Sequence, residues 1–202
     1  MEKPIIENRT YSFNIEKRDD VSPMIKGHAA VFEERTSIPF WGFDEMVARN
    51  AFTDTIKQDD VRALFNHDAN FVLGRNTSKT LRLSEDNKGL AIEIDPPDTQ
   101  VARDLMQLLK RGDISQMSFA FQIEKESWEK GGEGKPDLRI LERVKLFDVS
   151  VVTFPAYEGT DAGLRSYNQW LSETKPKQGI YKVSLLKRRL NLIQRKGGKL
   201  NG

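Results

Sequence analysis

The chain has 202 residues, and its 32 Lys and Arg residues against 30 Asp and Glu residues give a formal net charge of +2. This length fits one domain with extensions or two small domains, and a 38% share of hydrophobic residues is enough for a core, which argues against wholesale disorder. The absence of cysteine excludes disulfides and a thiol nucleophile, and no run of about 18 uncharged apolar residues is present to form a membrane-spanning helix.

Alternation of apolar and polar residues predicts several strands in the first half of the chain. These strands are expected over residues 11–15, 25–33, 61–67, 71–74, 80–83 and 90–94. Residues 36–47 are rich in aromatic and turn-forming residues and are expected to form a structured loop. Asn50 is expected to cap a short helix over residues 51–56, and residues 85–89 to form a hairpin connection.

The clearest helix is expected to begin after Asp98 or Thr99, either of which can cap it. It has an apolar stripe at helical spacing, formed by Val101, Leu105, Leu108 and Leu109. Basic residues lie in its last turn, where they suit the helix dipole, and Gly112 is expected to end it.

Two alternating strands follow, over residues 116–124 and 137–153, with a Gly-rich hairpin tip at residues 130–136. Short helices are expected over residues 160–167 and 183–195. Roughly seven or eight short strands with few helices and no regular strand–helix alternation predict a mainly β fold, a β-barrel or a sandwich with peripheral helices.

The charge is unevenly distributed along the chain. Residues 175–202 contain nine basic residues and no acidic one, so residues 1–174 hold 23 basic and 30 acidic residues, a net charge of −7. The basic segment is either a solvated helix or a surface for a partner. Clustered cations neutralise phosphates, but the segment has a single aromatic residue, Tyr181, and no nucleic-acid motif, so nucleic-acid binding is the weaker interpretation.

His67 and His28 are the only histidines in the sequence. Histidine is the side chain whose charge changes near neutral pH, so one of them is the first candidate for a general base. His67 ends a predicted strand, where it has either a catalytic role or a structural one. His28 has small apolar neighbours, which favours a structural role. Two histidines, no cysteine and no cofactor-binding motif lead us to expect neither a metal nor a cofactor.

Ser118 is a candidate nucleophile, although a serine in a strand is more often structural because an unactivated hydroxyl is weakly nucleophilic. Its predicted neighbours on the same face, Ala120 and Gln122, are small or polar, which suggests that the hydroxyl opens onto a cleft. Ser115, in the turn before this strand, is a competing candidate.

Asp148 stands in an otherwise apolar predicted strand. A carboxylate in such a place is unfavourable unless it is paired or exposed. It either orients a histidine, as in serine hydrolases, or pairs with a nearby cation such as Lys145.

A series of short motifs resembles the prohead proteases of tailed phages, which are serine proteases of capsid maturation related in fold to herpesvirus assemblin. The motifs lie in order and at matching spacing over residues 27–32, 60–68, 72–75, 80–83, 102–105, 111–113, 117–119 and 147–157. The resemblance covers residues 25–166 and implies a herpesvirus-protease-like barrel of about seven strands.

The resemblance implies a role for three residues of this chain. His67 matches the general base and Ser118 the nucleophile. Herpesvirus enzymes use a second histidine as the third member, which this chain does not have after His67, so Asp148 is expected in that place, with Glu142 in reserve. Backbone amides of residues 153–159 are expected to form the oxyanion hole.

The resemblance further implies a serine endopeptidase that processes the procapsid during head maturation. Its partners would be the major capsid protein and its scaffolding segment, with the protease itself as a further substrate and possible self-association. It would act inside the assembling procapsid in the host cytoplasm, with no membrane. Residues 1–24 are then an N-terminal extension or first strand, residues 25–166 the protease domain, and residues 167–202 a removable basic extension. The alternative is a non-catalytic capsid scaffold or assembly factor.

Overall fold

The computed structural model describes residues 5–12, 16–17, 24–38, 41–154 and 161–174. These residues form eleven strands and three helices. In chain order they are β1 (Glu7–Ser12), β2 (Glu16–Lys17), β3 (Ile25–Val31), β4 (Thr36–Ser37), β5 (Phe43–Val47), α1 (Thr53–Gln58), β6 (Arg62–Phe65), β7 (Asp68–Arg75), β8 (Leu81–Glu85), β9 (Gly89–Ile94), α2 (Gln100–Arg111), β10 (Gln116–Glu129), β11 (Asp137–Val152) and α3 (Asp161–Thr174).

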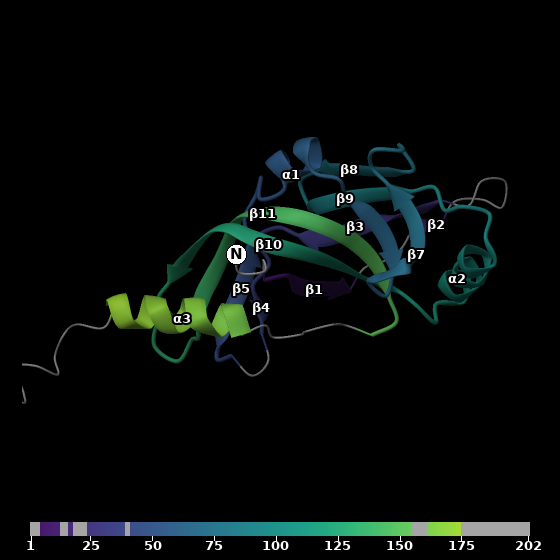
Figure 1. Ribbon diagram of the computed structural model, residues 1–202. Coiled ribbons are helices and arrows are strands. Elements are labelled where there is room, and N and C mark those ends of the chain that lie inside the picture. Colours follow the sequence, from purple (N-terminus) through teal and green to yellow (C-terminus); the bar gives the residue numbers. More distant parts are fainter. Residues whose placement is uncertain (1–4, 13–15, 18–23, 39–40, 155–160, 175–202) are drawn as a thin grey trace, which may run out of the picture. The chain divides into compact units, whose positions relative to one another are not determined.

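The strands pair in two sheets (Figure 1). The larger sheet has the order β1-β10-β11-β5-β4, and β6 joins it by pairing with both β11 and β7. The smaller sheet has the order β2-β3-β9-β8. Most pairs are antiparallel, whereas β5 and β6 each pair with a different part of β11 in parallel. The predicted mainly β fold is confirmed; the described strand pairs form two sheets rather than a closed ring.

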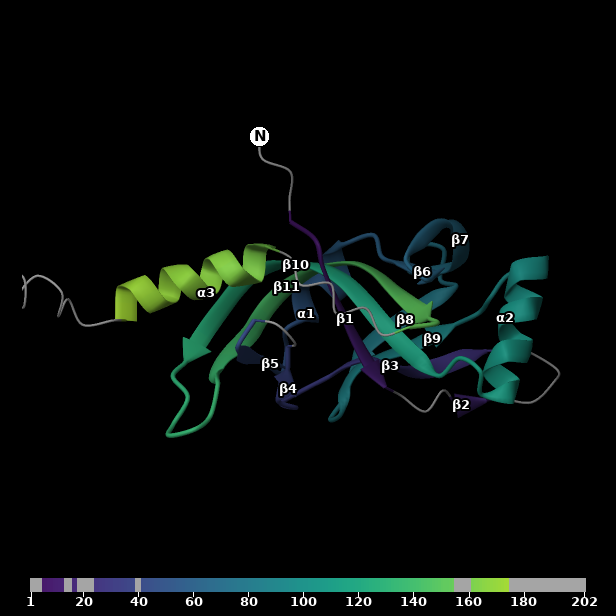
Figure 2. The ribbon, with the colours of Figure 1, turned by 90° about the horizontal axis from the view of Figure 1, so that it is seen from below.

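The long hairpin of β10 and β11 lies at the centre of the larger sheet, and β1 runs alongside β10 (Figure 2). The expected hairpin tip at residues 130–136 connects the two long strands. The other expected hairpin, at residues 85–89, joins β8 to β9. This hairpin arrangement brings the beginning, the middle and the end of the first compact unit, Met1–Asp161, into one sheet.

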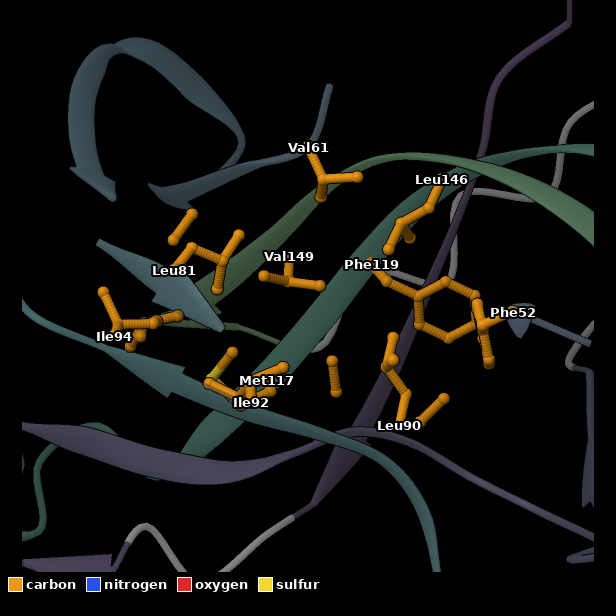
Figure 3. Packing of buried hydrophobic residues seen from close by; sticks show 14 of the residues in the cluster. Phe52, Val61, Leu81, Leu90, Ile92, Ile94, Met117, Phe119, Leu146 and Val149 are labelled. Atoms are coloured by element: carbon orange, nitrogen blue, oxygen red, sulfur yellow. The ribbon is translucent and has the colours of Figure 1, made fainter. Parts of the chain in front are cut away.

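The hydrophobic core lies between the two sheets (Figure 3). Leu90 and Ile92 of β9 approach Met117 and Phe119 of β10, and all four side chains are almost fully buried. Phe119 also makes an edge-on contact with Phe52, with ring centroids 5.5 Å apart. Each such side chain stabilises the fold by about 1.5–3 kcal/mol when it is fully buried.

Helix α2 begins and ends as the sequence predicts. The Thr99 side chain accepts a hydrogen bond from the Ala102 amide, which satisfies one of the helix's unpaired donors. Gly112 has a φ of +84°, and its N–H group donates to the carbonyl groups of the last turn, as in a glycine C-cap.

Two predictions about the segment before β6 are wrong. Residues 36–47 include β4 and β5, because Phe43 and Val47 are buried and β5 pairs in parallel with β11. Asn50 does not cap α1; it has a φ of +65° and lies before the helix. The Glu85 carboxylate instead accepts hydrogen bonds from the Phe52 amide and the Thr53 hydroxyl.

Helix α3 is longer than the predicted helix over residues 160–167, and nearly all of it belongs to a second unit, Ala162–Gly202. The basic helix predicted over residues 183–195 lies outside the described residues. Across the part of the chain that the structure describes, none of the helices has the length and apolar character needed to span a membrane.

Candidate active site

His67 was predicted to end a strand, but it lies in a tight turn. β6 ends at Phe65 and β7 begins at Asp68, so Asn66 and His67 alone connect the two strands. Their φ angles are +55° and +57°. Two consecutive left-handed residues are typical of a type I′ hairpin turn, whose second position usually holds glycine. A histidine there carries backbone strain of about 1–3 kcal/mol, which the surrounding contacts must offset.

Asn66 supplies those contacts. Its backbone amide donates to the Val151 carbonyl group at 2.9 Å. Its side chain accepts from the Thr153 amide at 2.8 Å and donates to the Thr153 hydroxyl at 3.1 Å. The His67 turn is therefore fastened to the end of β11 by three hydrogen bonds. Asn66 was not among the predicted site residues, although an Asn between two apolar runs is itself a turn signal.

A β-bulge in β11 determines where Asp148 points. Pairing with β10 passes from Leu146 directly to Asp148, so Phe147 is the extra residue. Leu146 packs in the core before the bulge, and Val149 and Val151 pack in the core after it. The bulge thus reverses the alternation, and Asp148 shares the opposite face with Ser150.

Ser118 reaches the same face from β10. Its neighbours Met117 and Phe119 point into the core, so the serine side chain points away from the core. Ser118 is the register partner of Ser150 in β11 and of Thr10 in β1. Strand pairing therefore fixes the serine beside the residues that follow the bulge.

These elements bring Ser118, His67 and Asp148 into one hydrogen-bonded chain. The Ser118 Oγ lies 2.8 Å from the His67 Nε2, and the His67 Nδ1 lies 2.7 Å from the Asp148 Oδ1. Each ring nitrogen of His67 thus faces one partner. A neutral imidazole that donates from Nδ1 to the carboxylate has its Nε2 lone pair directed at the serine hydroxyl. Such an arrangement can remove the hydroxyl proton and leave a nucleophilic oxygen.

Ser118 does not open onto a cleft, contrary to the prediction. Its exposed fraction is 0%, whereas Asp148 and the His67 side chain are 9% and 17% exposed. The Ser118 hydroxyl also lies 2.9 Å from the Arg9 carbonyl oxygen in β1. A serine hydroxyl has one proton, so the Arg9 carbonyl and the His67 Nε2 compete for it.

A buried group of charges holds β1 in place on its other face. Arg9 lies between Glu7 and Glu45, with nitrogen–oxygen distances of 2.5 Å to each. Arg139 contacts the same two carboxylates at 3.1 and 3.2 Å and Glu126 at 2.7 Å. Burial alone would lower the pKa of Arg9, but the nearby carboxylates of Glu45 and Glu7 outweigh it and raise the pKa. Both arginines therefore remain charged.

The other candidate residues lie in different surroundings. Glu142 forms an ion pair with Lys125 at 2.5 Å, and hydrogen bonds from Lys125 and Ser127 lower its pKa. His28 lies 2.8 Å from Asp86, on the smaller sheet. Ser115 is exposed in the turn before β10. The structure therefore brings neither of the reserve candidates, Glu142 and Ser115, into contact with His67.

The expected oxyanion segment, residues 153–159, is described only at its start. The Thr153 amide donates to Asn66, so it is already engaged. Residues 155–159 lie outside the described part of the chain. Among the described residues, no group of three or more His, Cys, Asp or Glu side chains is arranged to hold a metal ion.

Comparisons with known proteins bear on the fold and the family. A family model described as caudovirus prohead serine protease matches residues 10–173. Among solved structures, the chain resembles the bacteriophage T4 capsid assembly protease gp21, with a TM-score of 0.51 and 14% sequence identity over 76% of this chain and 100% of that chain. At this level of identity the likeness concerns the fold. A comparison with curated protein sequences found no match.

Proposed function

Because the chain belongs to the caudovirus prohead serine protease family, and is thus a serine peptidase of capsid maturation, we propose that Ser118 is its nucleophile and His67 its general base. The observation that carries this proposal is the hydrogen-bonded chain from Ser118 through His67 to Asp148. Asp148 would hold the imidazole in the required tautomer and stabilise its charged form. Family membership argues against the alternative of a non-catalytic scaffold.

In the first step, the His67 Nε2 takes the Ser118 proton while the Ser118 Oγ attacks the carbonyl carbon of the scissile peptide bond. The resulting imidazolium then gives its proton to the departing amine, which leaves an acyl group on Ser118. Water, deprotonated by the same nitrogen, attacks the acyl carbon, the bond from that carbon to the Ser118 Oγ breaks, and the imidazolium returns the proton to the Ser118 Oγ. Asp148 stays ionised throughout and stabilises the positive charge on His67 in both halves of the reaction.

The substrates we propose are the scaffolding segment of the major capsid protein and the protease itself. The reaction would take place inside the assembling procapsid, in the host cytoplasm. Residues 25–166 would form the protease domain, together with the strand that β1 adds, and residues 167–202 would be a removable extension. What supports these assignments is membership in a family of capsid maturation proteases.

Co-expression with the major capsid protein of the same phage tests the proposal. Wild-type protein is expected to shorten the capsid protein, and Ser118→Ala and His67→Ala are expected to reduce processing by about 10⁴-fold or more, since the members of a triad act as a unit. Gel electrophoresis and mass spectrometry measure the products.

Two variants serve as matched controls, Ser115→Ala and His28→Gln. They remove the same chemical groups at positions away from the hydrogen-bonded chain and are expected to process like wild type. Undiminished processing by Ser118→Ala would show that another residue is the nucleophile.

A further inference from the structure

The hydroxyl of Ser150 contacts the Asp148 carboxylate. The Ser150 Oγ donates to the Asp148 Oδ1 at 2.6 Å, and that same oxygen accepts from the His67 Nδ1 at 2.7 Å. Ser150 itself has an exposed fraction of 0%. One carboxylate oxygen is thus shared by the imidazole and by a second, fully buried serine.

The position of Ser150 follows from strand pairing. It lies two residues after Asp148 on β11, and both residues follow the Phe147 bulge. The side chains of Asp148 and Ser150 therefore lie on the same face of the sheet. Its register partners are Ser118 in β10 and Leu64 in β6, so a neighbouring strand flanks it on each side. This confinement leaves the hydroxyl little freedom to turn away from the carboxylate.

A carboxylate in this position needs such a donor. Asp148 is 9% exposed, and burial disfavours its charged form unless hydrogen bonds compensate. Among the described residues, His67 and Ser150 are the two donors to its side chain. A hydrogen bond to an ionised acceptor is shorter and stronger than one between neutral groups, in keeping with the 2.6 Å distance.

We propose that Ser150 is a positioning residue of the proteolytic site, which keeps the Asp148 carboxylate ionised and its Oδ1 directed at the His67 Nδ1. This inference rests on the proposed function of Ser118, His67 and Asp148. Ser150 touches neither the substrate nor the reacting hydroxyl in this role. It acts through Asp148, and its removal changes how readily His67 accepts a proton.

The sign of that change follows from charge. The Ser150 hydroxyl stabilises the negative charge of Asp148. This stabilisation is larger when His67 is neutral than when His67 is protonated, because a positive imidazolium already offsets the negative charge. Removing the hydroxyl therefore favours protonation of His67. The neutral base would then be available only at higher pH, so the acidic limb of the pH profile moves to higher pH.

The experiment uses the full-length protein and an alkyl fluorophosphonate, which labels an activated serine without requiring a capsid substrate. The labelling rate of Ser118 is measured across the pH range for wild type, Ser150→Ala and Ser150→Thr. For Ser150→Ala we expect a rate roughly tenfold lower at neutral pH, which corresponds to about 1.4 kcal/mol, and an acidic limb at higher pH. Ser150→Thr keeps the hydroxyl and is expected to restore both properties.

Thr55→Val is the matched control. The Thr55 hydroxyl is also buried and donates to a carboxylate, the Asp59 Oδ2, at 2.7 Å. Its loss is expected to lower the thermal midpoint while the pH dependence of labelling stays as in wild type. An equal slowing of Ser150→Ala at every pH, with no shift of the acidic limb, would overturn the inference and indicate a purely structural role.

Imidazole NMR gives a second measurement on the same variant. The chain has two histidines, so a His28→Gln background leaves His67 as the single source of imidazole signals. In Ser150→Ala we expect the His67 Nδ1–H signal to shift, with backbone spectra close to those of the parent protein. An unchanged signal together with unchanged labelling would refute the role of Ser150, whereas a wild-type protein that does not label at Ser118 would overturn the proposed function and this inference with it.

Discussion

His67 occupies a backbone position that a glycine would fill with less strain. Its φ of +57° follows the +55° of Asn66, and an L-residue with a large side chain is uncommon there. The geometry has a use, because the turn projects the imidazole toward β10 and β11 while both flanking strands stay in the sheet. The strain is offset by the three hydrogen bonds that Asn66 makes with Val151 and Thr153.

This arrangement predicts that Asn66→Gly impairs catalysis more than folding. Glycine adopts the left-handed conformation freely, so the backbone of the turn remains possible, but both side-chain hydrogen bonds to Thr153 are lost. We expect a fluorophosphonate labelling rate at least tenfold lower, with a thermal midpoint within a few degrees of wild type.

Asn66→Ala is the companion variant. It loses the same side-chain amide and adds strain at a positive φ, so it is expected to be the less stable of the two. Full labelling activity in Asn66→Gly would show that the turn positions His67 without help from Thr153.

At this scale, the sequence named Ser118 and His67 from their match to a family pattern, and Asp148 as the expected third member with Glu142 in reserve. The structure joins Ser118, His67 and Asp148 by hydrogen bonds, and their roles stay a prediction. The hydrogen bonds of Asn66 and Ser150 were not predictable in the same way. A serine two residues after an aspartate, or an asparagine before a histidine, acquires meaning only when strands distant in the sequence pair and bring their partners close.

Strand β1 lies beside the proposed nucleophile in the same sheet. It pairs with β10 from Glu7 to Ser12, and its Arg9 carbonyl accepts from the Ser118 hydroxyl. The buried charges of Glu7, Arg9, Glu45 and Arg139 hold it there. While β1 stays in this position, the Arg9 carbonyl competes with His67 for the Ser118 proton, and the proposed nucleophile is fully buried.

Glu45→Gln is therefore expected to loosen β1 without leaving an excess of charge. Two arginines and the carboxylates of Glu7 and Glu126 would remain, and the amide keeps a hydrogen-bonding group beside Arg9. We expect the free energy of unfolding to fall by about 1.5–3 kcal/mol, as for the loss of a hydrogen bond to a charged group. Amide hydrogen exchange in β1 should become faster, and labelling of Ser118 should become several-fold faster.

Thermal unfolding, hydrogen exchange and the labelling rate measure these three effects on one sample. The Lys125 partner Glu142 offers a control, since Glu142→Gln removes a carboxylate from an exposed ion pair and is expected to change stability by less than about 1 kcal/mol. Slower labelling in Glu45→Gln, with faster exchange in β1, would mean that β1 assists the reaction instead of obstructing it.

Elements that depend on their own residues were predicted better than elements that depend on distant ones. Helix α2 has its cap, its apolar stripe and its terminal glycine within the segment, and its ends were confirmed. Helix α1 was predicted, but its cap was not, because Glu85 from another strand supplies it. β5 was mispredicted as a loop, because it is a strand through its pairing with β11. The Phe147 bulge was likewise not predicted, although the apolar positions change phase there, from Leu146 before it to Val149 and Val151 after it.

At the scale of the whole chain, the division of charge runs close to the division into compact units. The first unit, Met1–Asp161, contains every residue of the proposed site, and the nine cations of residues 175–202 all belong to the second, Ala162–Gly202. The proposed catalytic residues and the basic segment thus belong to different units. The basic segment is then free to serve another purpose, which we take to be bringing the protease into the assembling shell.

Deleting residues 175–202 is expected to separate these two purposes. The truncated protein should label with the fluorophosphonate at the wild-type rate, because none of the residues in the hydrogen-bonded chain or in the β1 charge group is removed. Its incorporation into procapsids should fall sharply, and the loss should be mimicked at high salt, since exposed charges more than about 10 Å apart are screened at 0.1 M ionic strength and more strongly above it. Sedimentation of procapsids followed by mass spectrometry measures incorporation.

Equal incorporation of truncated and full-length protein would place the targeting determinant in the first unit. A truncated protein that is incorporated but not labelled would mean that residues 175–202 contribute to the reactivity of Ser118.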